Sequence, residues 1–303
     1  MKTQLRTKFA LFAAGSVLAA AAQAETFFPA AGDFLAAQGY DPAIVAEVAG
    51  PHVRVRVMTP EGLLRLRDRI PADTKNRAAL VRSLEELSEY GGGSMKNFGE
   101  IVSPDYNVPD DIISGNAADC YILPVGSKET VTGMLHNMGV FTEAAITSPG
   151  MDKRQMDLFQ TVHEMRHCHA VESGDASEYK NEDAADWFGV KIISRVFNDP
   201  ALALPIIYAR SGNVGQYHTA LYVDAMRRGE APPAKEDVRT AQEFVFALGR
   251  KYQVSAESGP VHEWRYQQMK RVAEDGNNHL SGLQSRVVQL YIDAYQALTR
   301  PQP

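Results

Sequence analysis

Two histidines stand four residues apart in the middle of the chain, His163 and His167, and Glu164 follows the first of them, giving the pattern H-E-x-x-H. On an α-helix, residues at i and i+4 leave the same face about one turn apart. Both imidazoles would then reach one metal ion, with Glu164 beside them as a candidate base. The pattern therefore requires a helix with a metal-binding face, and it is typical of zinc hydrolases.

The residues before the pattern favour a helix with one buried side. Asp152 follows a turn-forming segment and can act as the N-cap, and no Gly or Pro interrupts the chain from there to Glu172. Apolar residues recur at helical spacing just before His163, namely Met156, Phe159 and Val162. A partly buried helix is the setting that a zinc site needs.

A third protein ligand is expected shortly after the second histidine, because a catalytic zinc ion normally takes three ligands from the protein and keeps one position for water. Asp175 and Glu178 have the spacing of a capping box that opens a second helix. On that helix Glu182 and Asp186 share a face with the small residue Gly189, which allows close packing. We expect Glu182 to be the third ligand. Asp186 is better placed to accept the free ring N–H of one histidine.

The two patterns together, H-E-x-x-H and the E-x-x-A-D that begins at Glu182, resemble the gluzincins, which include thermolysin-like and CAAX-prenyl-protease-like metallopeptidases. The resemblance covers about 24 residues. It implies zinc held by His163, His167 and Glu182, with Glu164 as general base and Asp186 supporting a ligand. It also implies hydrolysis of peptide bonds by zinc-activated water, whereas the residues themselves indicate only a zinc hydrolase.

The fold class expected from these features is α+β and zincin-like: a small mixed sheet packed on the metal-binding helix, with a mostly helical C-terminal half. An edge strand of such a sheet could hydrogen-bond an extended peptide substrate. Three segments are expected: a signal peptide at 1–24, the metal-binding domain at 25–198 and a helical subdomain at 199–303. Local patterns predict strands at 52–57, 101–102, 121–125 and 140–146, helices at 61–70, 76–90, 203–209, 217–228, 235–252, 261–273 and 280–298, and a hinge or loop at 91–93.

The N-terminus has the form of a secretory leader. Three basic residues precede an apolar run too short to span a membrane, and the motif Ala22-Gln23-Ala24 predicts cleavage after Ala24. No later segment reaches the length of a membrane span. The leader carries three basic and no acidic residues, so its removal changes the formal net charge from −6 to −9. We therefore expect a periplasmic or secreted acidic protein with a peptide or protein substrate and no nucleic-acid partner.

Two cysteines, Cys120 and Cys168, would meet an oxidising compartment after export. Cys168 directly follows His167, and Cys120 begins a strand-like run. A disulfide would tie the metal-binding helix to that strand. Two unpaired buried thiols are equally compatible with the sequence.

The sequence leaves two questions of function open. The developing oxyanion of a substrate needs a donor besides zinc, and no spacing argument selects among the candidates His218, Tyr217, His262 and Tyr266. The second question is the class of protein. Besides a peptidase, the patterns allow a zinc amidase acting on the cell envelope, or a non-enzymatic binding or assembly protein with a structural or degenerate zinc site. The presence of Glu164 argues against the last reading, because a structural site has no use for a base.

Overall fold

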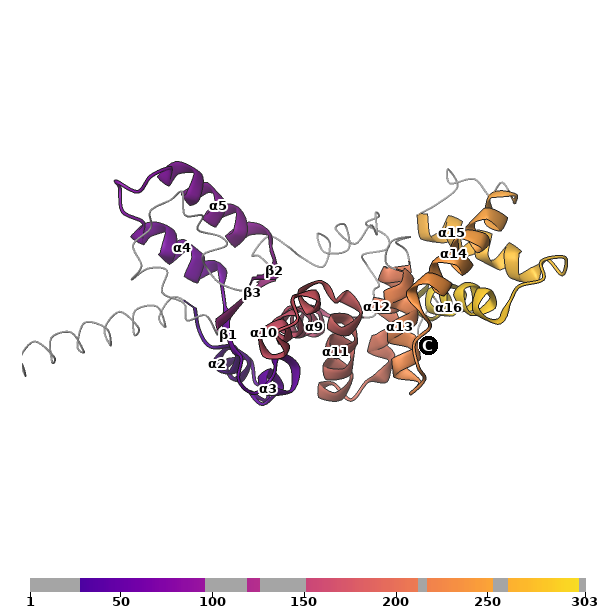
Figure 1. Cartoon of the computed structure of the whole chain (residues 1–303), viewed down its shortest axis with the longest axis horizontal. Helices are drawn as coiled ribbons and strands as arrows, with labels where there is room; N and C mark the ends of the chain where they lie inside the picture. The colour runs from indigo at the N-terminus through magenta and orange to yellow at the C-terminus, as the bar shows by residue number, and fades with distance from the viewer. Residues whose placement is uncertain (1–27, 96–118, 126–150, 212–216, 253–260, 300–303) are drawn as a thin grey trace, which may run out of the picture. The chain divides into compact units, whose positions relative to one another are not determined.

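The computed structural model describes residues 28–95, 119–125, 151–211, 217–252 and 261–299. The predicted leader and the β-like runs at 101–102 and 140–146 lie outside this part of the chain. Most of the described residues are helical, and the strands form one small sheet (Figure 1). The coarse expectation of an α+β chain with a helical second half is confirmed.

The chain divides into two compact units. One comprises residues 1–129 and 160–180, and the other comprises 130–159 and 181–303. This division differs from the boundary expected at residue 198, because helix α11 (Glu182–Val196) groups with the later helices.

The first unit contains a three-stranded mixed sheet with strand order β1-β3-β2. Strand β1 (Arg54–Val57) runs parallel to β3 (Asp119–Val125), with Val55 opposite Cys120. Strand β2 (Gly91–Met95) runs antiparallel to β3. The hinge or loop predicted at the three glycines of this segment is wrong, because pairing with β3 supplies their backbone groups with hydrogen bonds that override weak strand propensity.

Two helices and the sheet share the apolar core of the first unit. Helix α4 (Pro60–Arg69) begins at the N-cap Thr59, whose side chain accepts from the N–H of Gly62, and it packs beside α5 (Arg77–Tyr90) (Figure 1). Helices α2 (Ala31–Ala37) and α3 (Ile44–Ala49) precede the sheet. The core consists of Phe28, Met58, Leu63, Leu66, Ile70, Leu80, Leu84, Tyr121 and Leu123.

Helix α9 (Lys153–His167) carries the H-E-x-x-H residues. The predicted N-cap Asp152 is confirmed: its carboxylate accepts from the N–H of Gln155 at 2.8 Å, and the Gln155 side chain accepts from the N–H of Asp152 at 2.8 Å. This reciprocal pair is a capping box, which satisfies two of the otherwise unpaired N–H groups at a helix start. The helix does not continue to Glu172 without a break, since it ends at His167 and a short helix α10 (His169–Ser173) follows.

The helix that carries Glu182 begins later than its predicted capping box. Asp175 instead caps a 3₁₀ helix, η3 (Ala176–Lys180), by accepting from the N–H of Ser177 at 2.8 Å. Helix α11 starts at Glu182 itself, and its N-cap is Asn181, whose side chain accepts from the N–H of Ala184. The capping box predicted for this helix is therefore wrong, because Asn181 provides a cap directly before the first helical residue.

Close packing of α11 on α9 depends on Gly189, as expected. A Cβ atom placed on Gly189 would lie 2.6 Å from the Phe159 ring, below any ordinary carbon contact. Only glycine fits at this crossing without a shift of the neighbouring side chain.

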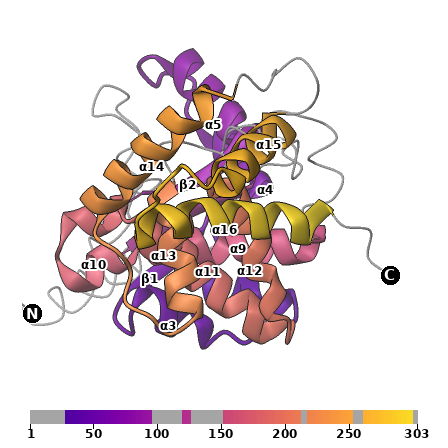
Figure 2. The ribbon, with the colours of Figure 1, turned by 90° about the vertical axis from the view of Figure 1, so that its right-hand side faces the viewer.

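The second unit is helical. Its later elements are η4 (Pro200–Leu202), α12 (Ala203–Ser211), α13 (Tyr217–Arg227), α14 (Lys235–Arg250), α15 (Val261–Glu274) and α16 (Gly282–Thr299), which confirms the helical stretches predicted in this half. Helix α12 contacts α11, α13 and α16, while α16 also contacts α14 and α15 (Figure 2). None of the helices in the described part of the chain is long and apolar enough to cross a membrane.

Candidate metal centre

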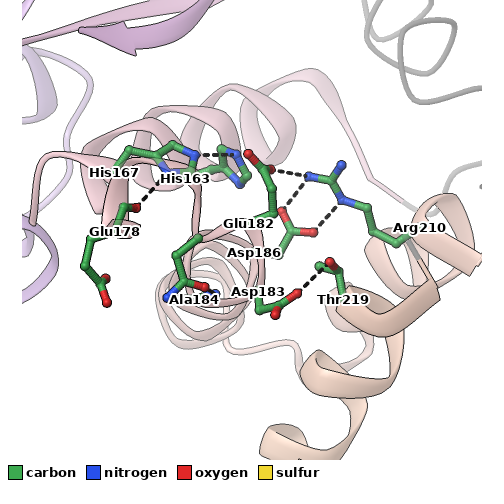
Figure 3. Close-up of polar contacts among 10 residues, drawn as sticks. His163, His167, Glu178, Glu182, Asp183, Ala184, Asp186, Arg210 and Thr219 are labelled. Atoms are coloured by element: carbon green, nitrogen blue, oxygen red, sulfur yellow. Dashed lines mark hydrogen bonds and ion pairs between the residues drawn. The ribbon is translucent and has the colours of Figure 1, made fainter. Parts of the chain in front are cut away.

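The last turn of α9 brings two imidazoles together. His163 and His167 are both buried, and their Nε2 atoms lie 3.2 Å apart (Figure 3). Their ring planes are nearly perpendicular, at 82°. The helical spacing of four residues produces this approach, as the sequence predicts.

The remaining nitrogen of His167 faces the backbone. Its Nδ1 atom lies 3.5 Å from the carbonyl oxygen of Glu178, in the 3₁₀ helix η3. A carbonyl at this position favours the tautomer with the proton on Nδ1, which leaves the Nε2 lone pair available to a metal ion. The supporting acceptor for this histidine is thus a main-chain group, which side-chain patterns in the sequence do not reveal.

Glu182 completes the group. One ligand atom from each of His163, His167 and Glu182 lies within 4.8 Å of the other two. Glu182 is the first residue of α11, and its side chain is 48% exposed, whereas both histidines are buried. An acidic residue in the first helical turn is stabilised by the positive end of the helix dipole. The structure therefore brings together the three side chains that the sequence predicts as ligands.

Asp186 forms an ion pair with a residue that no sequence pattern predicts. Arg210, on α12, donates from Nε and Nη2 to the two Asp186 carboxylate oxygens, at 2.5 and 2.8 Å. Both side chains are buried. The same Nη2 lies 3.5 Å from a carboxylate oxygen of Glu182 (Figure 3). Arg210 therefore links the proposed third ligand to the buried aspartate that was expected to accept from a histidine.

Glu164, the candidate base, is half-buried on α9 between His163 and the fully buried Met165. Its neighbour on the other side of Met165, Arg166, donates to the carbonyl of Val48 at 3.3 Å and to the Glu178 carboxylate at 3.1 Å. Arg166 thus fixes η3 and the end of α3 against α9.

Cys120 and Cys168 form a disulfide, with their Cα atoms 5.7 Å apart. This bond selects one of the two alternatives that the sequence left open. It joins the central strand β3 to the residue that directly follows His167. The sheet and the residue at the end of α9 are therefore covalently connected.

A second buried carboxylate stands next to Glu182. Asp183 accepts from the hydroxyl of Thr219 at 2.7 Å, and its other oxygen lies 2.9 Å from Nδ1 of His218 and 3.1 Å from Nζ of Lys235. Burial opposes ionisation of Asp183, but the hydrogen bonds from His218, Thr219 and Lys235, together with the electrostatic attraction of His218, outweigh it and lower its pKa to about 2. The carboxylate therefore anchors α11 to α13 and to the start of α14.

The four candidate oxyanion donors have different surroundings in the structure. Tyr217 is completely buried and donates its hydroxyl to the carbonyl of Val287, so it is a packing residue. Tyr266 stacks on Tyr295, with ring centroids 4.3 Å apart. His218 is bound to the Asp183 carboxylate. The side chain of His262 lies outside the described residues.

Comparison of the chain with family models, curated proteins and solved structures returned no match.

Proposed function

We propose that the protein is a zinc-dependent peptidase, with His163, His167 and Glu182 as the ligands. The observation that carries the proposal is the 3.2 Å separation of the two Nε2 atoms. Tetrahedral zinc with Zn–N bonds of about 2.0–2.1 Å requires nitrogens roughly 3.3 Å apart. The buried imidazoles therefore fit two corners of one coordination sphere, and the carboxylate of Glu182 fits a third.

The donor set supports a catalytic role for the metal. Two histidines and one glutamate leave the fourth position of zinc for water or substrate, whereas structural sites usually have four protein ligands and are rich in cysteine. When bound, zinc would polarise a substrate carbonyl and lower the pKa of water. In this proposal Glu164 accepts the proton of the attacking water and later donates it to the leaving amine.

The contacts of Glu182 support its assignment as a ligand. The side chain is half exposed, so the protein must limit its rotation if it is to bind a metal reproducibly. Arg210 lies 3.5 Å from its carboxylate and is itself held by two hydrogen bonds to Asp186. A guanidinium fixed in this way orients the ligand through charge without entering the coordination sphere.

Peptide or protein substrates are proposed from the resemblance to gluzincins together with the position of β2. This strand stands at the end of the order β1-β3-β2, so within the described sheet one of its edges is unpaired. An extended peptide can add to such an edge through main-chain hydrogen bonds, which are independent of side-chain sequence. We further propose that the enzyme acts in the periplasm or outside the cell, after removal of its leader.

The test combines metal content with hydrolysis. Purified mature protein should contain one equivalent of zinc by mass spectrometry and should cleave unfolded casein in a chelator-sensitive way. His163→Ala should lose the metal, and Glu164→Gln should keep the metal while losing about 100-fold or more of the activity, because an amide cannot accept the proton. His52→Ala is the matched control, since this exposed histidine lies outside the cluster and its replacement should change neither quantity.

Other outcomes would identify a different protein. A metal-free wild type would indicate that an Nε2–H···Nε2 hydrogen bond between the histidines produces their short separation. Zinc without casein cleavage, but with release of peptides from peptidoglycan, would favour the amidase. Zinc with full biological effect in Glu164→Gln would favour a binding or assembly protein.

A further inference from the structure

A cavity of about 240 Å³ lies in the helical unit and contains none of the proposed metal ligands. Its wall is formed by the end of α13, the start of α12 and one face of α16. Three arginines line it, Arg227, Arg228 and Arg286. Such a concentration of guanidinium groups around a small cavity suggests a site for an anion, because their planar N–H groups match the geometry of carboxylates and phosphates.

A buried aspartate positions two of these arginines. Asp224 is almost fully buried beneath them and accepts from Arg227 Nη2 on one oxygen, at 2.8 Å, and from Arg228 Nε on the other, at 3.0 Å. One carboxylate thus holds two guanidinium groups and leaves one positive charge in excess. The contact with Asp224 is the single ion pair that Arg227 makes within the described residues. The Nε and Nη1 groups of Arg227 therefore remain for a ligand.

The third arginine is incompletely satisfied. Nη2 of Arg286 is buried and makes no hydrogen bond within the described part of the chain, although a Glu230 carboxylate oxygen lies 3.2 Å away. The other oxygen of Glu230 accepts from Arg228 at 2.6 Å. Gly229, with φ of +70°, turns the chain at the end of α13 and so places Glu230 beside both arginines. Glu230 is 44% exposed, and such surface pairs are weak enough for a ligand anion to replace them.

The rest of the wall indicates the kind of anion. The charged side chains that line the cavity are three arginines and two aspartates, which gives a formal net charge of +1. Glu230, which is not part of the wall, offsets this charge until a ligand anion replaces it. Leu204, Leu290 and Ala294 add an apolar side. The volume is below the roughly 300–1,000 Å³ of pockets that hold drug-sized ligands. We propose that this cavity binds a small monocarboxylate, with its carboxylate between Arg227 and Arg286 and its hydrocarbon chain against the leucines.

The proposal is tested by calorimetric titration of the full mature protein with sodium butyrate at constant ionic strength. Butyrate should bind saturably at one site in the millimolar range, as expected for a ligand of six heavy atoms. Neutral butyramide, which has nearly the same shape, should not bind. Inorganic phosphate should bind more weakly than butyrate because it gains nothing from the apolar side. Tighter binding of phosphate, equal binding of butyramide, or no saturation by butyrate would each overturn the proposal.

Variants locate the site. Arg227→Gln and Arg286→Gln should each weaken butyrate binding about tenfold, the loss expected for one charge-assisted hydrogen-bonding group. Glu230→Gln should strengthen binding severalfold, because it removes the carboxylate that competes for the same arginines. Arg239→Gln is the control, since Arg239 is exposed on α14 and pairs with Glu236. Circular dichroism establishes that each variant is folded. Unchanged affinity in both Arg227→Gln and Glu230→Gln would place the ligand elsewhere.

Discussion

At the scale of single residues, Arg210 joins the candidate metal centre to the protein interior. It is a buried cation whose partners are the buried Asp186 and the half-exposed Glu182. Burying a charge is unfavourable unless it is paired, so removal of one partner leaves the other uncompensated. The pair therefore contributes more to the position of Glu182 than to net stability.

We predict that Arg210→Met lowers the free energy of unfolding by about 3–5 kcal/mol, because the Asp186 carboxylate is then buried without its partner. The double variant Arg210→Met, Asp186→Leu should regain most of that stability, yet its zinc affinity should stay about 10 to 100-fold below that of the wild type. Urea unfolding and competitive zinc titration measure the two effects. Full zinc affinity in the double variant would show that Glu182 needs no support from Arg210.

Asp183 gives the protein a defined sensitivity to acid. Its pKa is about 2 in the folded chain and 3.8 in the unfolded one, so its stabilising contribution is complete above about pH 5 and is lost as the pH falls towards 2. The difference corresponds to about 2 kcal/mol. We expect the unfolding free energy of Asp183→Asn to fall less steeply than that of the wild type between pH 5 and pH 2. If urea unfolding shows the same dependence of the unfolding free energy on pH in both proteins, the lowered pKa of Asp183 is contradicted.

The sequence predicted the three candidate metal ligands better than the residues that hold those ligands in place. His163, His167 and Glu182 could be found because helical spacing places side chains on one face without reference to the rest of the fold. Arg210 could not be found in this way, since it is distant in sequence from these three residues and its pairing with Asp186 depends on how α11 and α12 pack. Its one local signal is that it directly follows the apolar run from Pro205 to Ala209 and is buried with it.

At the scale of helices, the crossing of α9 and α11 depends on the absence of a side chain at one position. We predict that Gly189→Ala lowers the unfolding free energy by about 1–3 kcal/mol, because its Cβ would displace the Phe159 ring. Gly249→Ala is the matched control: its Cβ would meet Gln268 at 3.5 Å, an ordinary contact, so helix propensity should make it neutral or stabilising. Urea unfolding of both variants measures the difference. Equal changes of unfolding free energy in the two variants would mean that α9 and α11 move apart easily to accommodate the added Cβ atom.

Sequence patterns predicted which segments are helices but not every element boundary. The helical stretches of the second half follow from amphipathic periodicity, which is a local property. The strand at Gly91–Met95 has no such signal, because it exists only through its pairing with β3. The start of α11 was misplaced for a related reason: both Asp175 and Asn181 are good caps, and sequence alone does not say which turn continues as an α-helix.

At the scale of the whole molecule, the proposed leader yields a direct prediction. Secreted protein should begin at Glu25 when its N-terminus is sequenced, because the small residues Ala22 and Ala24 fit the signal peptidase. Ala24→Arg should block cleavage, since a large charged side chain does not fit that requirement, and the protein should remain with the membrane fraction. Wild-type protein that retains Met1 would contradict export by this route.

The division of the molecule also shows a limit of sequence patterns. The expected boundary at residue 198 followed the change from mixed to helical elements. Compactness instead depends on which surfaces pack together, and α11 buries Ala185, Val190, Ile192 and Ile193 in the unit that contains the later helices. A change in the type of secondary structure is therefore not in itself a domain boundary.

The disulfide between Cys120 and Cys168 closes a loop of the backbone, and both His163 and His167 lie inside that loop. A cut in the peptide chain anywhere between the two cysteines would therefore nick the molecule without releasing a fragment. The histidines would stay tethered to strand β3 until a thiol reductant opened the bond. For a peptidase, whose own copies are available substrates at high concentration, this covalent closure would make self-digestion within the loop survivable.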